Sequence, residues 1–348
     1  MKTINKHKRI ACIILLAAMV LTLCSCGESK AYQMQVVAMD TVMTLTAYGR
    51  NAQKGLNSAK ATIVALDSSV DPDIETSTVY EINHAAGEQT MISGQIAEML
   101  ITAKDIYEKS NGSYDLTIYP LIDRWGFNNG KYYVPTDEEI AQDLSRLCMD
   151  QLTVSSFPAS GTFVVTLPSY GEISFASCAK GCAAKYAIDA MRKSGVTSGI
   201  VSLGGNVQTL GLKPDGSNWT VGIVDPNNTS GYLATVSVGE TAIVTSGTYQ
   251  RYMPDNPKYH HIFSPKTGYP TNNGLKSLTV ICEDGTEADC LSTAMFVLGK
   301  SGALNYWASN GGFEMIIIDS DNQITATIGL QEKIDLKNDN YTLKYYEG

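Results

Sequence analysis

The sequence predicts an α+β fold, in which helices flank a mixed, largely antiparallel sheet. Segments with strand character outnumber those with helix character and often follow one another directly, which is typical of antiparallel pairing and not of a doubly wound sheet. Hydrophobic residues make up 44% of the 348 residues, enough for a packed core, so a disordered or collagen-like chain is excluded. With roughly 150 residues per domain as a guide, this length predicts one large domain or two closely joined ones.

Periodicity places the individual elements. Apolar residues spaced three and four apart predict helices, and alternation predicts strands. The helices are expected at residues 54–67, 95–109, 179–194 and 286–298. The strands are expected at residues 36–48, 198–203, 219–224, 232–238, 242–244, 259–263, 276–282 and 313–319. Asp71-Pro72 and Asn111-Gly112 are stop signals for the first two helices.

Residues 128–170 change character and predict a small inserted lobe. A Thr136-x-x-Glu139 capping box opens a short helix that we expect to end at Cys148. Short strands are expected at 152–154 and 162–167.

The N-terminus predicts a lipoprotein signal peptide over residues 1–25 and a tether over 26–35. Four basic residues precede an uncharged apolar run at 10–23, which is shorter than the roughly 20 residues of a membrane span. The run ends in Leu23-Cys24-Ser25-Cys26-Gly27, which resembles a bacterial lipobox with Cys26 as the lipid-modified residue. We therefore expect a domain of residues 36–348 on the extracytoplasmic face of a bacterial membrane, held only by a lipid anchor. A plain secreted protein is the alternative.

The net charge argues against nucleic acid as a partner. The chain has 26 Lys and Arg against 35 Asp and Glu, a formal charge of −9, and its basic residues cluster only at the extreme N-terminus. Nucleic-acid binding rests on basic side chains that neutralise phosphates, so no such partner is expected.

Five cysteines remain beyond the N-terminal segment, which is an odd and sparse set for a disulfide scaffold. They are Cys148, Cys178, Cys182, Cys282 and Cys290. Cys178 and Cys182 lie four apart on an expected helix, where small core residues are favoured over a redox or metal pair.

Asp289 and Thr293 are candidate metal ligands. On the helix expected at 286–298 they are four residues apart and share a face. A carboxylate and a hydroxyl one turn apart suit Mg²⁺, which often takes only a few protein ligands. From these residues alone a structural role is favoured, with Asp289 near a helix N-terminus and Thr293 bonded to its own backbone.

Histidine is a natural base near neutral pH, and Tyr259-His260-His261 carries two adjacent ones. On a strand, neighbours point to opposite faces, so at most one of the two histidines faces a given site. A hydrogen-bonded structural histidine is the alternative.

Three glycine- and hydroxyl-rich segments could approach a diphosphate through their backbone N–H groups. They lie at 203–206 (Gly204 and Gly205), 245–249 (Thr245, Ser246 and Gly247) and 112–118. Ordinary turns use the same residues. Neither G-x-G-x-x-G nor G-x-x-x-x-G-K-[ST] occurs, so a nucleotide site would be assembled from several loops.

In their joint order these segments resemble the ApbE family of FAD:protein FMN transferases, over nearly all of residues 36–320. The matching runs are Met39-Asp40-Thr41, STVYEIN at 77–83, 112–121 with Trp125-Gly126-Phe127, Ala179-Lys180-Gly181, 203–206, 245–251, HIFSPKTG at 261–268 and 288–293.

The resemblance implies a T-fold-like architecture and a Mg²⁺-dependent reaction with FAD as substrate. FAD is cleaved, FMN is attached by a phosphoester bond to a Ser or Thr of another protein, and AMP is released. The acceptor would be an extracytoplasmic flavoprotein or a redox-pump subunit. Mg²⁺-dependent hydrolysis of FAD to FMN and AMP, or non-catalytic flavin binding by a lipoprotein, are the alternatives.

The resemblance also implies residue roles. His261 activates the acceptor hydroxyl, and Ser177, Asp289 and Thr293 hold the metal. Contacts to the flavin nucleotide fall on Met39, Ser113, Tyr114, Asp115, Lys180, Ile262, Phe263 and Ser292. Ser174 stands where the family has an acidic contact, Asp40 where it has glycine, Ser264 where Asp or Asn is common and Cys182 where Tyr is common.

Overall fold

The computed structural model describes residues 30–157 and 161–348. The segment predicted to be a signal peptide, residues 1–25, and the predicted lipidation site Cys26 lie outside the described residues. Within the described part, no helix is both long and apolar enough to cross a membrane.

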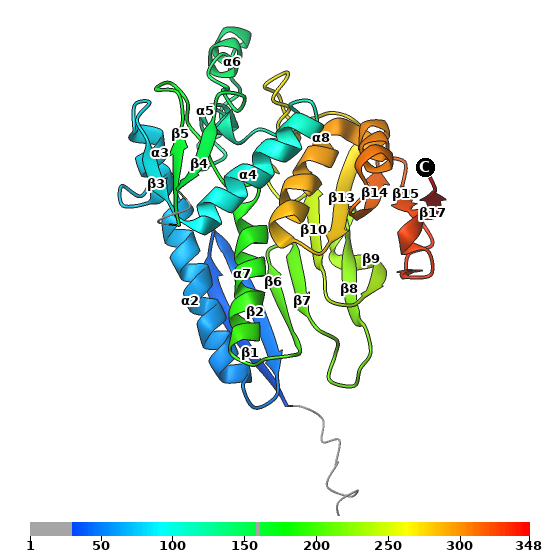
Figure 1. Ribbon diagram of the computed structural model, residues 1–348. Helices are drawn as coiled ribbons and strands as arrows, with labels where there is room; N and C mark the ends of the chain where they lie inside the picture. The colour runs from blue at the N-terminus through cyan, green and yellow to red at the C-terminus, as the bar shows by residue number, and fades with distance from the viewer. Residues whose placement is uncertain (1–29, 158–160) are drawn as a thin grey trace, which may run out of the picture.

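A nine-stranded sheet organises the molecule (Figure 1). Its spatial order is β1 (Ala31–Ala38), β2 (Thr41–Tyr48), β6 (Gly199–Leu203), β7 (Asn206–Leu210), β10 (Ala242–Gly247), β13 (Leu275–Cys282), β14 (Glu314–Asp319), β15 (Gln323–Thr327) and β17 (Thr342–Tyr346). All neighbours pair antiparallel except β15 with β17. The expected α+β fold with a mixed, largely antiparallel sheet is confirmed.

Helices cover one face of this sheet (Figure 1). They are α2 (Ala52–Val70), α4 (Gly94–Lys109), α7 (Ala179–Lys193) and α8 (Gly285–Asn310). Each buries an apolar stripe, such as Leu56, Ile63 and Leu66 of α2, and α4 packs across α7 and α8. The apolar period therefore located these helices correctly. The helix expected at 286–298 ends as predicted, because the backbone of Gly299 is not helical (φ 72°, ψ 174°) and kinks α8 there before a second helical stretch runs to Asn310.

A second, smaller sheet covers the opposite face. Its order is β16 (Ile334–Leu336), β9 (Asn228–Val238) and β8 (Trp219–Asp225). Side chains such as Trp219 and Val236 pack there against Ile243, Ile281 and Ile316 of the large sheet. Burial on both faces explains why the central strands are nearly continuous apolar runs.

The first strand was predicted wrongly. The expected strand over 36–48 is a hairpin, because Met39 and Asp40 reverse the chain with φ of 49° and 55°. β1 begins at Ala31, inside the stretch assigned to the tether. Asp is a common turn residue but Met is not, and the alternation continues through both, so alternation alone concealed the reversal.

Residues 128–170 do not stand apart as a lobe. The capping box at Thr136 and Glu139 is present and opens α6 (Asp137–Leu144). β4 (Thr153–Phe157) and β5 (Thr162–Thr166) form a sheet with β3 (Thr90–Ile92), which lies outside this segment. Cys148 and Leu152 belong to the main core, so this segment folds together with the rest.

The remaining elements are short. They are α3 (Thr78–His84), η1 (Leu116–Ile118), α5 (Tyr119–Arg124), β11 (Tyr252–Met253), β12 (Asn256–His260) and η2 (Ile328–Leu330). The strand expected at 259–263 ends at His260, and the chain then forms a loop in which the Thr271 N–H bonds the Ile262 carbonyl. The five described cysteines are buried and free, as expected.

Lys185 ties three helices together. Its ammonium bonds Glu98 of α4 at 2.7 Å and Asp284, the N-cap of α8. Burial alone would lower its pKa, but bonds to Asp284 and Glu98 raise it overall. We expect Lys185→Ala to lower the free energy of unfolding by about 1–3 kcal/mol in urea titrations, because two half-buried carboxylates lose their counter-charge. Lys109→Ala, whose ion pair with Asp105 is exposed, should stay within about 0.5 kcal/mol. Equal effects of the two substitutions would contradict this role.

Candidate functional site

Turns from distant parts of the chain meet beside the ends of β6, β7 and β10. Gly204 and Gly205 join β6 to β7 as a two-residue turn, with φ of 55° and 101°. Positive φ at both positions favours glycine. A Cβ added to Gly204 would lie 2.7 Å from Oγ1 of Thr41, directly after the Met39-Asp40 turn. The Gly205 carbonyl accepts a bond from Thr245 N–H at 3.3 Å.

The beginnings of α7 and α8 touch one another above this turn. A Cβ on Gly181 would lie 2.0 Å from the Gly285 carbonyl oxygen and 2.6 Å from Cβ of Asp289. This approach lets the Gly181 N–H donate to Oδ2 of Asp289 at 2.7 Å. Asp289 therefore caps the first turn of α7 from a neighbouring helix, where the helix dipole favours a negative charge.

Asp289 is buried, with only 5% of its surface exposed. Burial raises the pKa of Asp289, while the Lys180 charge, the Gly181 N–H and the Asn206 side chain each lower it part of the way. The positive charge near this carboxylate is thus insufficient to compensate its desolvation fully.

Two hydroxyl pairs attach further predicted residues to α7 and α8. The Ser246 and Ser292 hydroxyls are 2.8 Å apart, and the Ser292 hydroxyl also donates to the Asp289 carbonyl at 2.9 Å. The Tyr114 and Ser177 hydroxyls are 2.9 Å apart. Ser177 directly precedes Cys178, the N-cap of α7.

His261 lies in the loop after β12. Its Nδ1 is 3.1 Å from the Arg251 carbonyl oxygen. A carbonyl can only accept, so Nδ1 carries the proton and Nε2 keeps its lone pair. Burial and the nearby charges of Arg251 and Lys180 lower the pKa of His261 to about 3, so the ring is neutral at physiological pH. Because the Lys180 charge acts on both Asp289 and His261, the three side chains share one neighbourhood.

His260 has a different role. Its Nδ1 accepts from Ile262 N–H at 3.2 Å, so Nε2 carries the proton and donates to the Thr271 carbonyl at 2.9 Å. With both nitrogens engaged and 3% of its surface exposed, His260 is structural. The two histidines differ in their partners, since His261 is bonded to the Arg251 carbonyl through Nδ1. The sequence predicted that at most one of the two faces a given site.

Three predicted contact side chains face elsewhere. The Thr245 hydroxyl bonds Thr279 at 2.8 Å on the sheet face opposite Ser246. Ile262 is buried in the main core, and Phe263 packs against Trp125 and Phe127. Alternation along β10 puts Thr245 and Gly247 on one face and Ser246 on the other, so this segment offers the helix side a single hydroxyl.

The other predicted contacts lie on surrounding segments. Ser113 is buried, and Asp115 caps η1 through its bond to Thr117 N–H at 2.7 Å. Burial raises the pKa of Asp115 to about 6. Ser174 N–H bonds the Leu116 carbonyl at 3.1 Å, which joins the 113–116 segment to the approach to α7. Met39 N–H donates to Asp67 at 2.8 Å.

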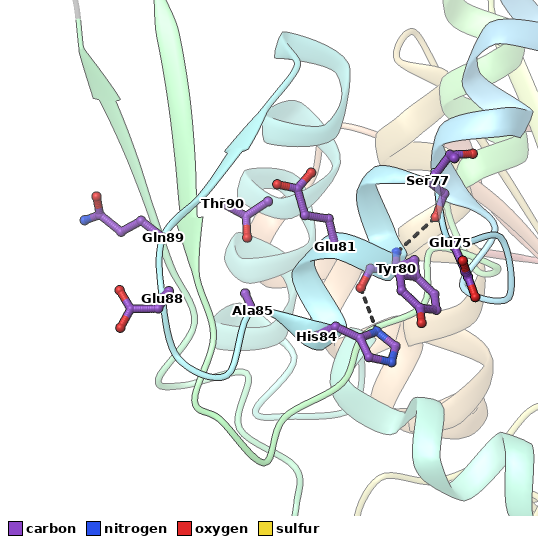
Figure 2. A pocket seen from close by; sticks show the side chains of 10 residues that line it. Glu75, Ser77, Tyr80, Glu81, His84, Ala85, Glu88, Gln89 and Thr90 are labelled. Carbon is purple, nitrogen blue, oxygen red and sulfur yellow. Dashed lines mark hydrogen bonds between the residues drawn. The ribbon is translucent and has the colours of Figure 1, made fainter.

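The STVYEIN motif holds the backbone of the segment that leads to Ser174. The Asn83 side chain bonds both the N–H and the carbonyl of Ile173, one residue before Ser174. Ser77 caps α3 by accepting from Tyr80 N–H, and His84 bonds the Tyr80 carbonyl (Figure 2). Ser77, Tyr80 and His84 line a cavity of about 540 Å³ together with Glu75, Glu81 and Glu88. None of the predicted contact residues lines this cavity.

A hard divalent cation fits the donor set around Asp289. Among residues 30–157 and 161–348, no three His, Cys, Asp or Glu side chains converge on a metal site. A metal here would therefore rest on one carboxylate plus neutral oxygens, a set that suits Mg²⁺ with retained water. The buried Asp289 carboxylate, whose desolvation the nearby groups offset only in part, supports such a ligand, because a bound cation would supply the missing positive charge.

Sequence reasoning missed two contributors. Asn206 and Arg251 lie within the matching runs 203–206 and 245–251, but the sequence assigned neither of them a role. The alternation of β7 predicts that Asn206 faces the helices, but its proximity to Asp289 depends on a pairing that no local pattern reveals.

The mixed sheet, the paired helix beginnings and the buried carboxylate bonded to the first turn of α7 define an α+β protein with a site suited to an anionic, metal-bound ligand. The family model described as "ApbE family" matches residues 39–317, and the chain belongs to that family.

Known relatives agree. The chain is 27% identical to "FAD:protein FMN transferase" of Haemophilus influenzae, covering 90% of this chain and 94% of that protein. It is 32% identical to a Klebsiella pneumoniae protein of the same name, covering 64% and 69%. The solved ApbE protein of Thermotoga maritima superposes with a TM-score of 0.79 at 26% identity, covering 87% and 99%.

Gly181 should tolerate no side chain. We expect Gly181→Ala to lower the free energy of unfolding by about 2–3 kcal/mol, because its Cβ would meet the Gly285 backbone of a packed helix. Urea titration measures the change. Gly94→Ala, at the start of α4 with its nearest neighbouring atom at 4.0 Å, should be neutral or slightly stabilising. A neutral Gly181→Ala would show that the close contact of α7 with α8 is not required.

Proposed function

We propose that the chain is an FAD:protein FMN transferase that requires Mg²⁺. It transfers FMN from FAD to a Ser or Thr hydroxyl of an acceptor protein and releases AMP. The observation that carries this proposal is the bond from the Gly181 N–H to Asp289 at 2.7 Å, which joins the first turn of α7, where Lys180 lies, to the beginning of α8. An anion-binding charge, a metal-competent carboxylate and a neutral base are the groups that phosphoryl transfer to a hydroxyl needs.

His261 serves as the base. Nδ1–H is held by the Arg251 carbonyl, so Nε2 is the atom that takes the acceptor's proton. The acceptor oxygen forms a bond to the phosphorus on the FMN side of the diphosphate, the bond from that phosphorus to the bridging oxygen breaks, and AMP leaves with that oxygen. General-base help of this kind is worth roughly 10²–10⁴-fold.

Several groups bind the diphosphate in this acidic protein. Lys180 supplies a charge in the first turn of α7, and the Gly204-Gly205 turn lets a ligand approach the backbone closely. Asp289 and Thr293, with an oxygen of Ser177, would hold Mg²⁺. When bound, the ion neutralises charge on the phosphate oxygens.

The test is a mixture of the protein, FAD, MgCl₂ and a flavoprotein encoded by a neighbouring reading frame. We expect yellow fluorescence on the denatured acceptor and one AMP per label. Free FMN and AMP without labelled protein would instead identify an FAD pyrophosphatase, and FAD that is bound but never cleaved would identify a flavin-binding protein.

We also propose that Cys26 carries a lipid anchor and that the enzyme works outside the cytoplasm. The lipobox resemblance at residues 23–27 supports this location. The acceptor is then an extracytoplasmic flavoprotein or a redox-pump subunit. We expect Cys26→Ser to move the protein from the membrane fraction to the soluble fraction, with Cys282→Ser as a control that stays membrane-bound. Membrane retention of Cys26→Ser would contradict the anchor.

A further inference from the structure

Two buried amides on β7 lack a hydrogen-bond partner. Asn206 and Gln208 have 3% and 6% of their surface exposed, and neither Nδ2 of Asn206 nor Oε1 of Gln208 makes a hydrogen bond. Both side chains point from the large sheet toward α7 and α8, because residues two apart on a strand share a face. An unpaired buried amide costs free energy, so each calls for an explanation.

Strand register places Asn206 under Asp289. Oε1 of Gln208 lies against Gly285, 2.4 Å from the position of an added Cβ. On β10, Ala242 pairs with Gln208 and Val244 with Asn206, and Ser246 lies further along and contacts Ser292 of α8. α8 therefore runs from the level of Gln208 past the level of Asn206.

The two spacings match. Two strand residues advance about 6.8 Å and four helix residues about 6 Å. Gln208 of β7 lies against Gly285 of α8. One step along, Asn206 of β7 therefore faces Asp289, which is four residues further along α8.

We propose that Asn206 is a positioning residue of the metal site. Its Nδ2, which has no partner in this structure, is placed to donate to the Asp289 carboxylate from the sheet side when the metal site is loaded, while the Gly181 N–H holds Oδ2 from α7. A carboxylate fixed from two sides presents its remaining lone pairs in one direction, which is how neighbouring groups raise the metal affinity of a ligand. This inference rests on the proposed function, because it concerns the metal that the transferase would use.

The experiment measures Mn²⁺ affinity by electron paramagnetic resonance, with the full chain and no flavin. We expect Asn206→Leu to raise the Kd for Mn²⁺ about 10-fold or more, the lower end for losing a partner of a metal ligand. The matched control is Gln208→Leu, which removes an equally buried unpaired amide one step further from Asp289 and should leave the Kd within twofold.

Thermal unfolding separates positioning from mere packing. Replacing an unpaired amide by an apolar side chain of similar size should leave the metal-free Tm unchanged or raise it. The rise in Tm caused by saturating Mn²⁺ in the wild type should shrink in Asn206→Leu but not in Gln208→Leu.

The outcomes are distinct. An unchanged Kd in Asn206→Leu overturns the inference and leaves the transferase proposal intact. If Asn206→Leu lowers the metal-free Tm but leaves the Mn²⁺-induced rise in Tm unchanged, Asn206 serves only packing, and the inference is again overturned. If the wild type binds no Mn²⁺ at all, the metal site itself fails, and this inference fails with it. Asn206→Ala repeats the comparison should the leucine variant not fold.

Discussion

Replacing Asp289 with asparagine is expected to lower FMN transfer by about 10³-fold or more. The substitution keeps the side-chain shape and an oxygen that can accept from the Gly181 N–H, but it removes the charge that would hold Mg²⁺. A metal that neutralises the transferring phosphate supplies several kcal/mol, and each 1.36 kcal/mol is tenfold in rate. The measurement is the initial rate of acceptor labelling at saturating FAD.

The same variant should remain folded. Burial raises the pKa of Asp289, so a neutral amide there costs the fold little. Its metal-free Tm should therefore equal or exceed that of the wild type, while the Tm gain with Mn²⁺ disappears. Transfer at the wild-type rate in Asp289→Asn would refute the metal role.

Replacing His261 with alanine is expected to lower FMN transfer by roughly 10²–10⁴-fold, the range for a lost general base. Mn²⁺ binding should be unchanged, because His261 belongs to the loop after β12 and Asp289 to α8. FAD hydrolysis by water should fall less than protein labelling. An equal loss in both reactions would contradict the assignment to the acceptor hydroxyl.

The adjacent histidine is the matched control. His260→Gln removes a ring that bonds Ile262 and Thr271, so it should lower the unfolding free energy by about 1–3 kcal/mol. At a temperature where this variant is folded, its transfer rate should stay within a few-fold of the wild type.

The pH profile gives a second test of His261. Its pKa of about 3 lies below the ordinary 6.5, so the ring of the free enzyme is already deprotonated above about pH 4. The value of kcat/KM, which reports the ionisation of the free enzyme, should therefore show no rise attributable to this histidine between pH 5 and 7. A rise near pH 6.5 that is lost in His261→Ala would contradict the neutral state.

Apolar periodicity and capping motifs in the sequence located those helices and strands in which these patterns are strong. The stripes of α2 and α4, the capping box of α6 and the run of β13 were placed within a few residues. Local signals failed at the Met39-Asp40 reversal, because the alternation of the two strands continues through it and concealed the turn preference of Asp40. They also failed for the segment 128–170, whose sheet is completed by β3 from far along the chain.

The chain by itself determined the chemistry that is local in sequence. Asp289 and Thr293 share a face because helical geometry puts residues four apart on one side. The difference between His260 and His261 is not of this kind, because the strand ends at His260 and His261 lies in the following loop. Joint motif order also determined family membership, now confirmed by the match over residues 39–317.

Only the tertiary structure decided which of these groups act together. It turned Thr245 and Ser246 to opposite faces, brought the Gly181 N–H to Asp289 and set Asn206 beneath that carboxylate. The physical reason is that strand register and helix packing depend on contacts between residues far apart in sequence, such as Gly181 and Asp289. These contacts determine which charged groups are buried together, and no pattern in a short stretch of sequence reveals them. The pKa shifts of Asp289 and His261 follow chiefly from burial and from charges that lie far away in sequence.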